Sequence, residues 1–454
     1  MSHTLKLKKG FDINLAGKAE KKIAACDQPE TFALKPTDFI GIQRPKLMVA
    51  EGDTVKAGTP ILFCKMMEDV KYCAPVSGEI VEVKRGEKRK LLEIKILADK
   101  EIVSEKFKKY SAADLANVEK DEVINAMTSS GVWPNIVQRP YGVVADPSET
   151  PKSIFISTFD SHPLAPDYDF CLKGEESFFQ AGVEILQKLT TGKVHVGLKA
   201  NGQASIFSNV QKAETYSVSG KHPAGNVGVQ IHHIDPVSKG DLVWTVGPQG
   251  VVQIGKLFLE GKYDASKTIA LTGSEVKEPQ YYKTYTGACI NKFIEKNVNS
   301  GDVRFVSGNV LTGEKIKSDG YVGFYHQQVT VIPEGKHSEF MGWILPTTKK
   351  LSIHRAFGLL SFLNGSKKEY VIDTNTKGEH RAFVQTGVFE RVTPMDILPT
   401  YLIKAIMAED YDEMESLGIY ELVEEDIALC EFVDVSKHDL QKILREGLDL
   451  IKNS

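Results

Sequence analysis

Short runs in which apolar and polar residues alternate predict an all-β domain over residues 40–100. Segments such as EIVEVK alternate with a period of two, and turn residues separate one run from the next, among them Gly58, Pro75 and Gly86. Such alternation is typical of strands with one buried face, because successive side chains point to opposite faces. Residues 1–39 are an N-terminal segment that precedes this domain.

Strand-like and helix-like segments alternate over residues 101–265. SIFISTFD and VHVGLK are apolar and rich in β-branched residues. GEESFFQAGVEILQKLTTGK between them has the spacing of an amphipathic helix, with Gly192 expected as a left-handed cap past its end. DLVWTV, GVVQIGKLFLEGK and KTIALTG repeat the order strand, helix, strand. Strands joined by helices form right-handed βαβ units, so we predict a Rossmann-like α/β domain with a mostly parallel sheet.

Two further domains are predicted in the second half of the chain. Residues 266–335 contain strand-like runs, an amphipathic helix in YTGACINKFIE and a returning strand that ends in SGNVLTG, which is the order of a small β-grasp domain. Residues 336–454 are expected to be mostly helical, from the pattern of PMDILPTYLIKAIMAEDYDEMESLG and DLQKILREGLDLIKN, with YELVEEDIALCEFVDVSK between them. The predicted fold class is therefore α/β and α+β, with several domains.

Composition limits the function classes. The chain has 454 residues, 42% of them hydrophobic, and a formal net charge of −4, so its charge gives no reason to expect a nucleic-acid partner. No apolar run approaches the roughly 18 residues that span a bilayer, and the N-terminus lacks the apolar core of a signal peptide. We therefore expect a soluble protein whose membrane contact is peripheral only. Six scattered cysteines without a CxxC pair argue against disulfides, zinc sites and iron–sulfur clusters.

Three other motifs have plain structural interpretations. HPAGNVG and VGPQG match neither GxGxxG nor GxxxxGK[ST], so both are expected to be simple turns without a nucleotide. His232 and His233 are predicted on opposite faces of a strand, which makes them packing or partner contacts rather than joint metal ligands. The basic residues between Lys84 and Lys90 are predicted at a hairpin tip. A solvated turn and a contact with anionic lipid or an acidic partner both remain open there.

The first domain resembles the hammerhead fold of biotinyl and lipoyl carriers. The resemblance rests on EGDTVKAGTPI followed by APVSGEIVEV, and Lys65-Met66 matches half of the biotin carriers' Met-Lys-Met. Cys64 replaces the first methionine, the acidic residue that precedes a lipoyl-lysine is missing, and the segment from Lys65 to Pro75 is long. We therefore expect Lys65 to lie off the tight tip turn and to carry neither biotin nor lipoate.

Motifs along essentially the whole chain resemble one family. They include KKGFDINLAG, SGVWPNIVQRPY, LTTGKVHVG, HPAGNVGVQIHHIDPV, SGNVLTG and MDILPTYLIKAI. They occur in a series of a biotinyl/lipoyl-like hammerhead, a Rossmann-like domain, an SLBB-like (soluble-ligand-binding) β-grasp domain and a helical domain. This series resembles the NqrA family, whose members are one of the subunits of the sodium-translocating NADH:quinone reductases.

The resemblance implies a peripheral subunit on the cytoplasmic face of the bacterial inner membrane. Its partners are then the remaining subunits (B to F) of a complex that oxidises NADH, reduces quinone to quinol and exports Na⁺. FMN, riboflavin, FAD and a 2Fe–2S cluster belong to those other subunits, so the resemblance implies no bound cofactor and no independent activity for this chain. The alternatives are a purely structural cap without substrate contact and, against the missing glycine loop and thiols, a stand-alone flavin/NADH oxidoreductase.

The resemblance also suggests a candidate site. In the related flavoprotein subunit of respiratory complex I, SGLRGRGGAGFPTG wraps the FMN phosphate. The matching stretch here is SGVWPNIVQRPY, in which side chains and Pro134 stand where backbone N–H groups should meet phosphate. The vacated pocket suits a quinone, with Trp133 and Tyr141 stacking on the ring and Arg139 donating to a carbonyl. Alternatively these residues only fill the pocket, and the pattern favours this second interpretation.

Overall fold

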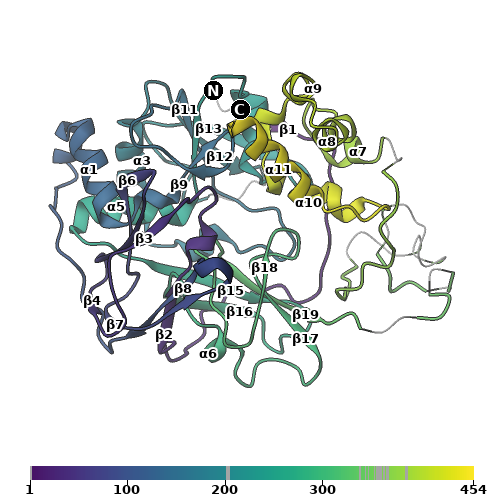
Figure 1. Ribbon diagram of the computed structural model, residues 1–454, viewed down its shortest axis with the longest axis horizontal. Coiled ribbons are helices and arrows are strands. Elements are labelled where there is room, and N and C mark those ends of the chain that lie inside the picture. The colour runs from purple at the N-terminus through teal and green to yellow at the C-terminus, as the bar shows by residue number, and fades with distance from the viewer. Residues whose placement is uncertain are drawn as a thin grey trace.

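A seven-stranded sheet lies at the centre of the computed structural model (Figure 1). The structure describes residues 3–200, 205–336, 339–342, 344, 345, 347–351, 353, 360, 363, 368–383 and 387–453. In spatial order the strands are β1 (His3–Lys6), β13 (Glu214–Ser219), β12 (Val194–Lys199), β11 (Ser153–Ser157), β14 (Val243–Val246), β9 (Ile136–Arg139) and β10 (Val143–Val144). From β1 to β14 the strands are parallel, whereas β9 pairs antiparallel with both β14 and β10. The predicted mostly parallel sheet is present, and its edge strand β1 comes from the N-terminal segment.

The helices of this domain are α1 (Lys120–Ser130), α2 (Tyr168–Cys171), α3 (Glu176–Gln187), α4 (Val227–Ile234) and α5 (Pro248–Glu260). α2 and α3 connect β11 to β12, and α4 connects β13 to β14. Glycines allow α3 and α5 to approach closely. A Cβ atom on Gly182 would lie 2.1 Å from the Val251 carbonyl oxygen, and one on Gly255 would lie 1.9 Å from the Phe178 carbonyl oxygen. A larger side chain at either glycine would therefore force the two helices apart.

One prediction for this part of the chain is wrong. Gly192 does not adopt the left-handed conformation expected of a helix cap, and α3 already ends at Gln187. A Cβ atom on Gly192 would lie 2.0 Å from the Lys152 carbonyl oxygen, so a close backbone approach requires the glycine instead. KTIALTG forms β15 (Ser266–Thr272), which belongs to the second sheet and lies within the predicted β-grasp domain over 266–335.

The second sheet has five strands and corresponds to the predicted β-grasp domain. Its order is β16 (Gln280–Tyr285), β15, β19 (Gln328–Pro333), β17 (Val303–Ser307) and β18 (Glu314–Ile316). The central pair β15 and β19 is parallel, and the other neighbours are antiparallel. The predicted amphipathic helix is a single turn, α6 (Asn291–Ile294).

The N-terminal β domain consists of two small antiparallel sheets. One contains β2 (Thr31–Leu34), β8 (Leu91–Ala98), β7 (Gly78–Arg85) and β4 (Thr54–Val55), and the other contains β3 (Pro45–Leu47), β5 (Pro60–Cys64) and β6 (Met67–Cys73). The predicted basic residues lie at the tip between β7 and β8. The expectation that Lys65 lies off a tight tip is wrong. Cys64 pairs with Met67, so Lys65 and Met66 form a two-residue turn at the tip of the β5–β6 hairpin.

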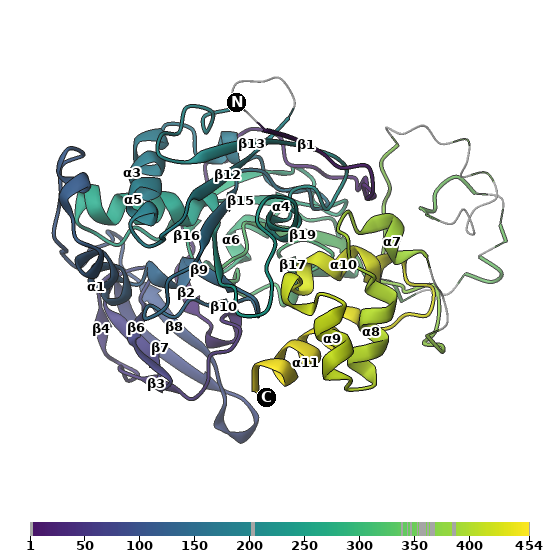
Figure 2. The same cartoon turned by 90° about the horizontal axis from the view of Figure 1, so that it is seen from above.

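The C-terminal part is helical from residue 389 onward. Its helices are α7 (Phe389–Val392), α8 (Pro399–Met407), α9 (Tyr411–Ser416), α10 (Glu424–Val433) and α11 (Leu440–Asn453). None of the described residues between 336 and 388 lies in an α-helix, and the rest of the predicted helical domain over 336–388 lies outside the described residues. Figure 2 shows these helices grouped beside the sheets, and their core includes Phe155 of β11 and Val229 of α4.

We expect the purified protein to carry no biotin or lipoyl group on Lys65, although the lysine is exposed at the hairpin tip. The flanking residue Cys64 is buried and its thiol donates to the Gln43 carbonyl oxygen at 2.9 Å, where the carrier motif has a methionine. Intact-mass spectrometry of the natively expressed chain should give the unmodified mass. An adduct on Lys65 would show that tip geometry alone suffices for modification.

Candidate functional site

The strand order of the large sheet changes direction at β11. The chain leaves β11 for β12 on one side of it, and returns from β13 through α4 to β14 on the other side. In open α/β sheets, ligands bind in the crevice beyond the carboxyl ends of the strands at such a switch point. The polar loop that follows β11, residues 158–167, therefore lies where a ligand is expected.

A cavity of about 550 Å³ lies at this switch point, within the size range of small-molecule sites. It is formed where the N-terminal segment, the α/β domain, the β-grasp domain and the C-terminal helices meet. Its lining residues with charged or hydrogen-bonding side chains include Asp38, Arg139, Asp160, His162, Tyr168, Tyr325 and Glu425. No one domain forms the cavity, so its shape depends on how the four parts are held together.

Asp160 and His162 form an ion pair in the cavity wall. Asp160 Oδ1 accepts a hydrogen bond from the His162 backbone N–H at 2.8 Å and lies 2.6 Å from His162 Nδ1. Burial opposes the charge on the imidazole, but the Asp160 carboxylate outweighs burial and raises the pKa of His162. The same pairing lowers the pKa of Asp160 against the effect of burial. His162 Nε2 is buried without a hydrogen-bond partner among the described residues, so the ring keeps one N–H donor free beside the cavity.

His222 lies next to this pair, and its pKa is shifted in the opposite direction to that of His162. The ring centroids of His162 and His222 are 4.6 Å apart, and His222 Nδ1 lies 3.0 Å from Ser161 Oγ. Burial and the neighbouring His162 lower the pKa of His222 to about 3. Environments that separate the pKa values of two like groups assign them different roles. His162 therefore takes the proton, while His222 stays neutral.

Arg139 connects the large sheet to the C-terminal helices. It ends β9 and is only 3% exposed, and its Nη1 and Nη2 donate to Asp426 Oδ2 and Glu425 Oε1, each at 2.5 Å. Both acids lie in the first turn of α10, where the helix dipole favours negative charge. Asp426 Oδ2 also accepts from the Val423 backbone N–H at 3.0 Å, which caps the helix. One buried cation therefore fixes where α10 begins relative to the sheet.

A second arginine strengthens the same junction. Arg445 of α11 donates to both carboxylate oxygens of Glu424, at 2.5 and 2.6 Å, and to the Tyr141 carbonyl oxygen at 2.7 Å. Tyr141 has a φ angle of 83°, a left-handed conformation that is uncommon outside glycine. Its ring packs edge to face on Tyr420, with the centroids 6.5 Å apart. Tyr141 is thus part of the contact between the β9–β10 hairpin and the C-terminal helices.

Trp133 lies in the protein core. It is fully buried, its Nε1 donates to the Ala145 carbonyl oxygen at 2.8 Å, and its ring meets Trp244 edge to face at 5.5 Å. The surrounding stretch forms a 3₁₀ turn (Trp133–Asn135) followed by β9, which pairs with β14. Part of the stretch that matches the phosphate-binding loop of the flavoprotein relatives, Ile136–Arg139, therefore lies within a sheet here.

The structure does not bring the three predicted quinone-site residues into one cavity wall. Arg139 lines the cavity, whereas Trp133 packs against the end of the β9–β10 hairpin and Tyr141 against the C-terminal helices. Asp160 and His162 were not identified from the sequence as site residues. The sequence feature that could have identified them is a polar loop directly after a buried strand of a βαβ unit. α/β domains place functional side chains at this position.

The prediction of a strand around His232 and His233 is wrong, because both residues lie in α4. The run GVQIHHI is rich in β-formers, but the chain must cross from β13 to the parallel strand β14, and such crossovers use helices. His232 Nδ1 lies 2.7 Å from Glu421 Oε2, and His233 Nε2 lies 2.7 Å from the Pro394 carbonyl oxygen. Both histidines thus pack the α/β domain against the C-terminal helices.

Within the described ranges, no three His, Cys, Asp or Glu side chains are grouped so that they could hold a metal ion. Cys430 is buried, its Sγ lies 3.2 Å from Thr393 Oγ1, and burial raises its pKa to about 12. Of the helices that the structure describes, none is long and apolar enough to cross a membrane.

Comparison with protein-family models gives three matches that together cover most of the chain up to residue 318. Residues 5–99 match the NqrA N-terminal barrel-sandwich hybrid domain. Residues 118–263 match the NqrA second alpha/beta domain, and residues 268–318 match the NQRA C-terminal domain. The order of the three matches is the order of the three domains described above.

Curated relatives match over the full length. The chain is 38% identical over 450 residues to the NqrA subunit of the Na(+)-translocating NADH-quinone reductase of Alcanivorax borkumensis, with 99% of each chain covered. It is 37% identical over 452 residues to the same subunit of Yersinia pestis, again with 99% of each covered. Two structures of NAD⁺-reducing [NiFe]-hydrogenase, in the H2-reduced and air-oxidized states, share 12% identity with it at TM-scores of 0.36 and 0.38. They cover 48% and 78% of this chain, and it covers 48% and 67% of theirs.

We expect Arg139→Ala to lower the free energy of unfolding by about 3–5 kcal/mol, because it leaves the buried carboxylate of Asp426 and the partly exposed carboxylate of Glu425 without their cation. Urea unfolding of the purified chain measures this change. The matched control is Arg445→Ala, which breaks a less buried pair with Glu424 and should cost about 1–2 kcal/mol. Equal losses in the two variants would contradict a special role for the buried pair.

Proposed function

This chain belongs to the NqrA family of the Na(+)-translocating NADH-quinone reductase, and from that membership we propose that it is a peripheral subunit located at the quinone-reducing end of the complex. We propose that it faces the cytoplasm and that its partners are the other subunits (B to F). In this proposal the flavins and the 2Fe–2S cluster belong to those partners, and this chain contributes binding surfaces rather than redox chemistry.

The observation that carries the proposal is the cavity at the switch point, with the free N–H donor of His162 beside it. A quinone ring is planar and apolar, and its carbonyl oxygens accept hydrogen bonds. A cavity of this size with one cationic donor and the aromatic rings of Tyr168 and Tyr325 in its walls suits such a headgroup. We propose that one quinone carbonyl accepts a hydrogen bond from His162 Nε2.

Trp133, Arg139 and Tyr141 have different roles in this proposed site. Arg139 contributes positive charge to the wall while it remains bonded to Glu425 and Asp426. Trp133 supports the β9–β10 hairpin from within, and Tyr141 holds that hairpin against α11 through Arg445. The three residues then act on the quinone mainly by fixing the shape of the cavity.

A purely structural cap is the second candidate, and one observation favours it. Trp133 is fully buried and Arg139 has its two terminal nitrogens bonded to carboxylates, so both are already used in packing and ion pairing. In a cap, the cavity would only be a junction between domains. The two candidates differ in whether a change in the cavity wall alters the kinetics with quinone.

We expect His162→Gln in the assembled complex to raise the KM for quinone about tenfold, the effect of losing one hydrogen bond from a charged donor. Glutamine can keep the contact with Asp160 through its amide nitrogen and then presents a carbonyl oxygen instead of a donor. Steady-state quinone reduction by the purified complex measures the change.

The control for this variant is His195→Gln, which changes a buried histidine of β12 that does not line the cavity. It should leave the KM for quinone unchanged. An unchanged KM in a fully assembled His162→Gln complex would favour the structural cap over the quinone site.

A further inference from the structure

A groove separate from the cavity crosses the C-terminal helices. It has a volume of about 590 Å³ and lies between the end of α8, the start of α9 and the outer side of α11. α8 and α11 pack closely at its base, since a Cβ atom on Gly447 would lie 2.8 Å from Ile406 Cγ1. None of its lining residues lines the switch-point cavity, so the two sites can be changed independently.

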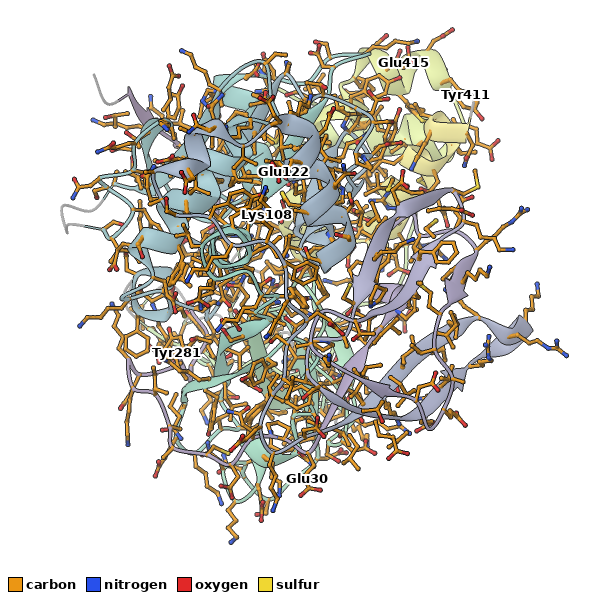
Figure 3. The ribbon with its side chains drawn as sticks, turned by 90° about the vertical axis from the view of Figure 1, so that its left-hand side faces the viewer. Glu30, Lys108, Glu122, Tyr281, Tyr411 and Glu415 are labelled. Carbon is orange, nitrogen blue, oxygen red and sulfur yellow. The ribbon has the colours of Figure 1, made fainter. Side chains whose placement is uncertain are left out.

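The floor of the groove is apolar and open to solvent. Ile406, Ile443 and Leu450 line it together with Met407 and Tyr411, which are 54% and 41% exposed. Figure 3 shows Tyr411 at the outer edge of the C-terminal helices. Adjacent exposed methionine and aromatic side chains are common at protein-binding surfaces, because they offer large contact area with little need for exact fit.

The rim of the groove is acidic. Glu409, Glu446 and Asp449 line it, and no lysine or arginine is among its lining residues within the described part of the chain. Cations of α11 pair with two of these carboxylates through exposed, long contacts, and Lys452 also lies near Asp449. Lys442 is 3.9 Å from Glu446 and mostly exposed, and Arg445 is 3.6 Å from Asp449 but bonds chiefly to Glu424. An apolar floor between acidic edges is complementary to an amphipathic segment that carries lysine or arginine beside its apolar residues.

We propose that this groove docks a short, lysine- or arginine-bearing amphipathic segment of a membrane-embedded partner subunit. The inference rests on the proposed function, which places the chain at the cytoplasmic side of a membrane complex. Cytoplasmic loops and tails of membrane proteins carry an excess of lysine and arginine, so that side supplies segments of the required charge. The apolar residues of the segment cover Met407 and Tyr411, and its cations lie beside Glu446 and Asp449.

A photocrosslinking amino acid, benzoylphenylalanine, placed at Met407 tests the docking in the intact complex. Illumination followed by peptide mapping should join this position to a lysine- or arginine-containing segment of a partner subunit. The same amino acid at Met66, exposed on the hairpin of the N-terminal domain, is the control position and should not give that crosslink. A crosslink from Met407 to lipid or to a second copy of this chain, or no crosslink at all, would overturn the proposal.

Charge reversal gives an independent measurement. The double variant Glu446→Lys with Asp449→Lys should weaken rebinding of the subunit to the complex that lacks it by about five- to tenfold, because both rim charges become repulsive. The matched double variant Glu278→Lys with Glu295→Lys makes the same change at exposed positions of the β-grasp domain and should rebind like the wild type. Equal affinities for the two double variants would overturn the proposal. Rebinding does not depend on the KM for quinone, so failure here is distinct from failure of the proposed quinone site.

Discussion

The buried contact of Arg139 with Glu425 and Asp426 is the constraint on which the arrangement of the domains depends. It joins positions 286 and 287 residues apart in the sequence, one at the end of a strand and the other two at the start of a helix. A charge removed from water is tolerated only when it is paired and hydrogen-bonded, so neither partner can move away alone. Because the same contact borders the cavity, the position of α10 and the shape of the cavity are determined together. The loop with Asp160 and His162 then faces a wall that belongs to another domain.

The sequence predicted the local elements better than their partners. Alternation and βαβ order identify the large sheet, since these patterns reflect which face of each element is buried. The strand β1 joins the large sheet through a contact between distant segments, which periodicity does not report. The helix at His232 was missed because the crossover between parallel strands overrides the strand propensity of its residues. The tip at Lys65 is not visible in the sequence, because the residues from Met67 to Cys73 belong to β6 and not to a longer turn.

The candidate site shows the same limit. Arg139 was identified from its motif, but its partners are two acids at the start of a helix, and no local pattern indicates that Asp426 is buried. The stretch from Ser130 to Tyr141 was expected to lack a phosphate-binding backbone, and in the structure it contains β9 and a buried tryptophan. A loop that packs as a strand has its N–H groups directed to a neighbouring strand. The polar atom of the site without a partner, His162 Nε2, lies instead in the loop that follows β11.

We propose that this chain is needed for quinone reduction, whereas NADH is oxidised by other subunits of the reductase. Deletion of the chain tests this assignment of roles most directly. Membranes from a strain that lacks the chain should still oxidise NADH with an artificial acceptor, but sodium-coupled quinone reduction should be lost. Reintroducing the wild-type chain should restore it. Normal sodium-coupled quinone reduction without the chain would contradict the proposal that the chain is needed for quinone reduction.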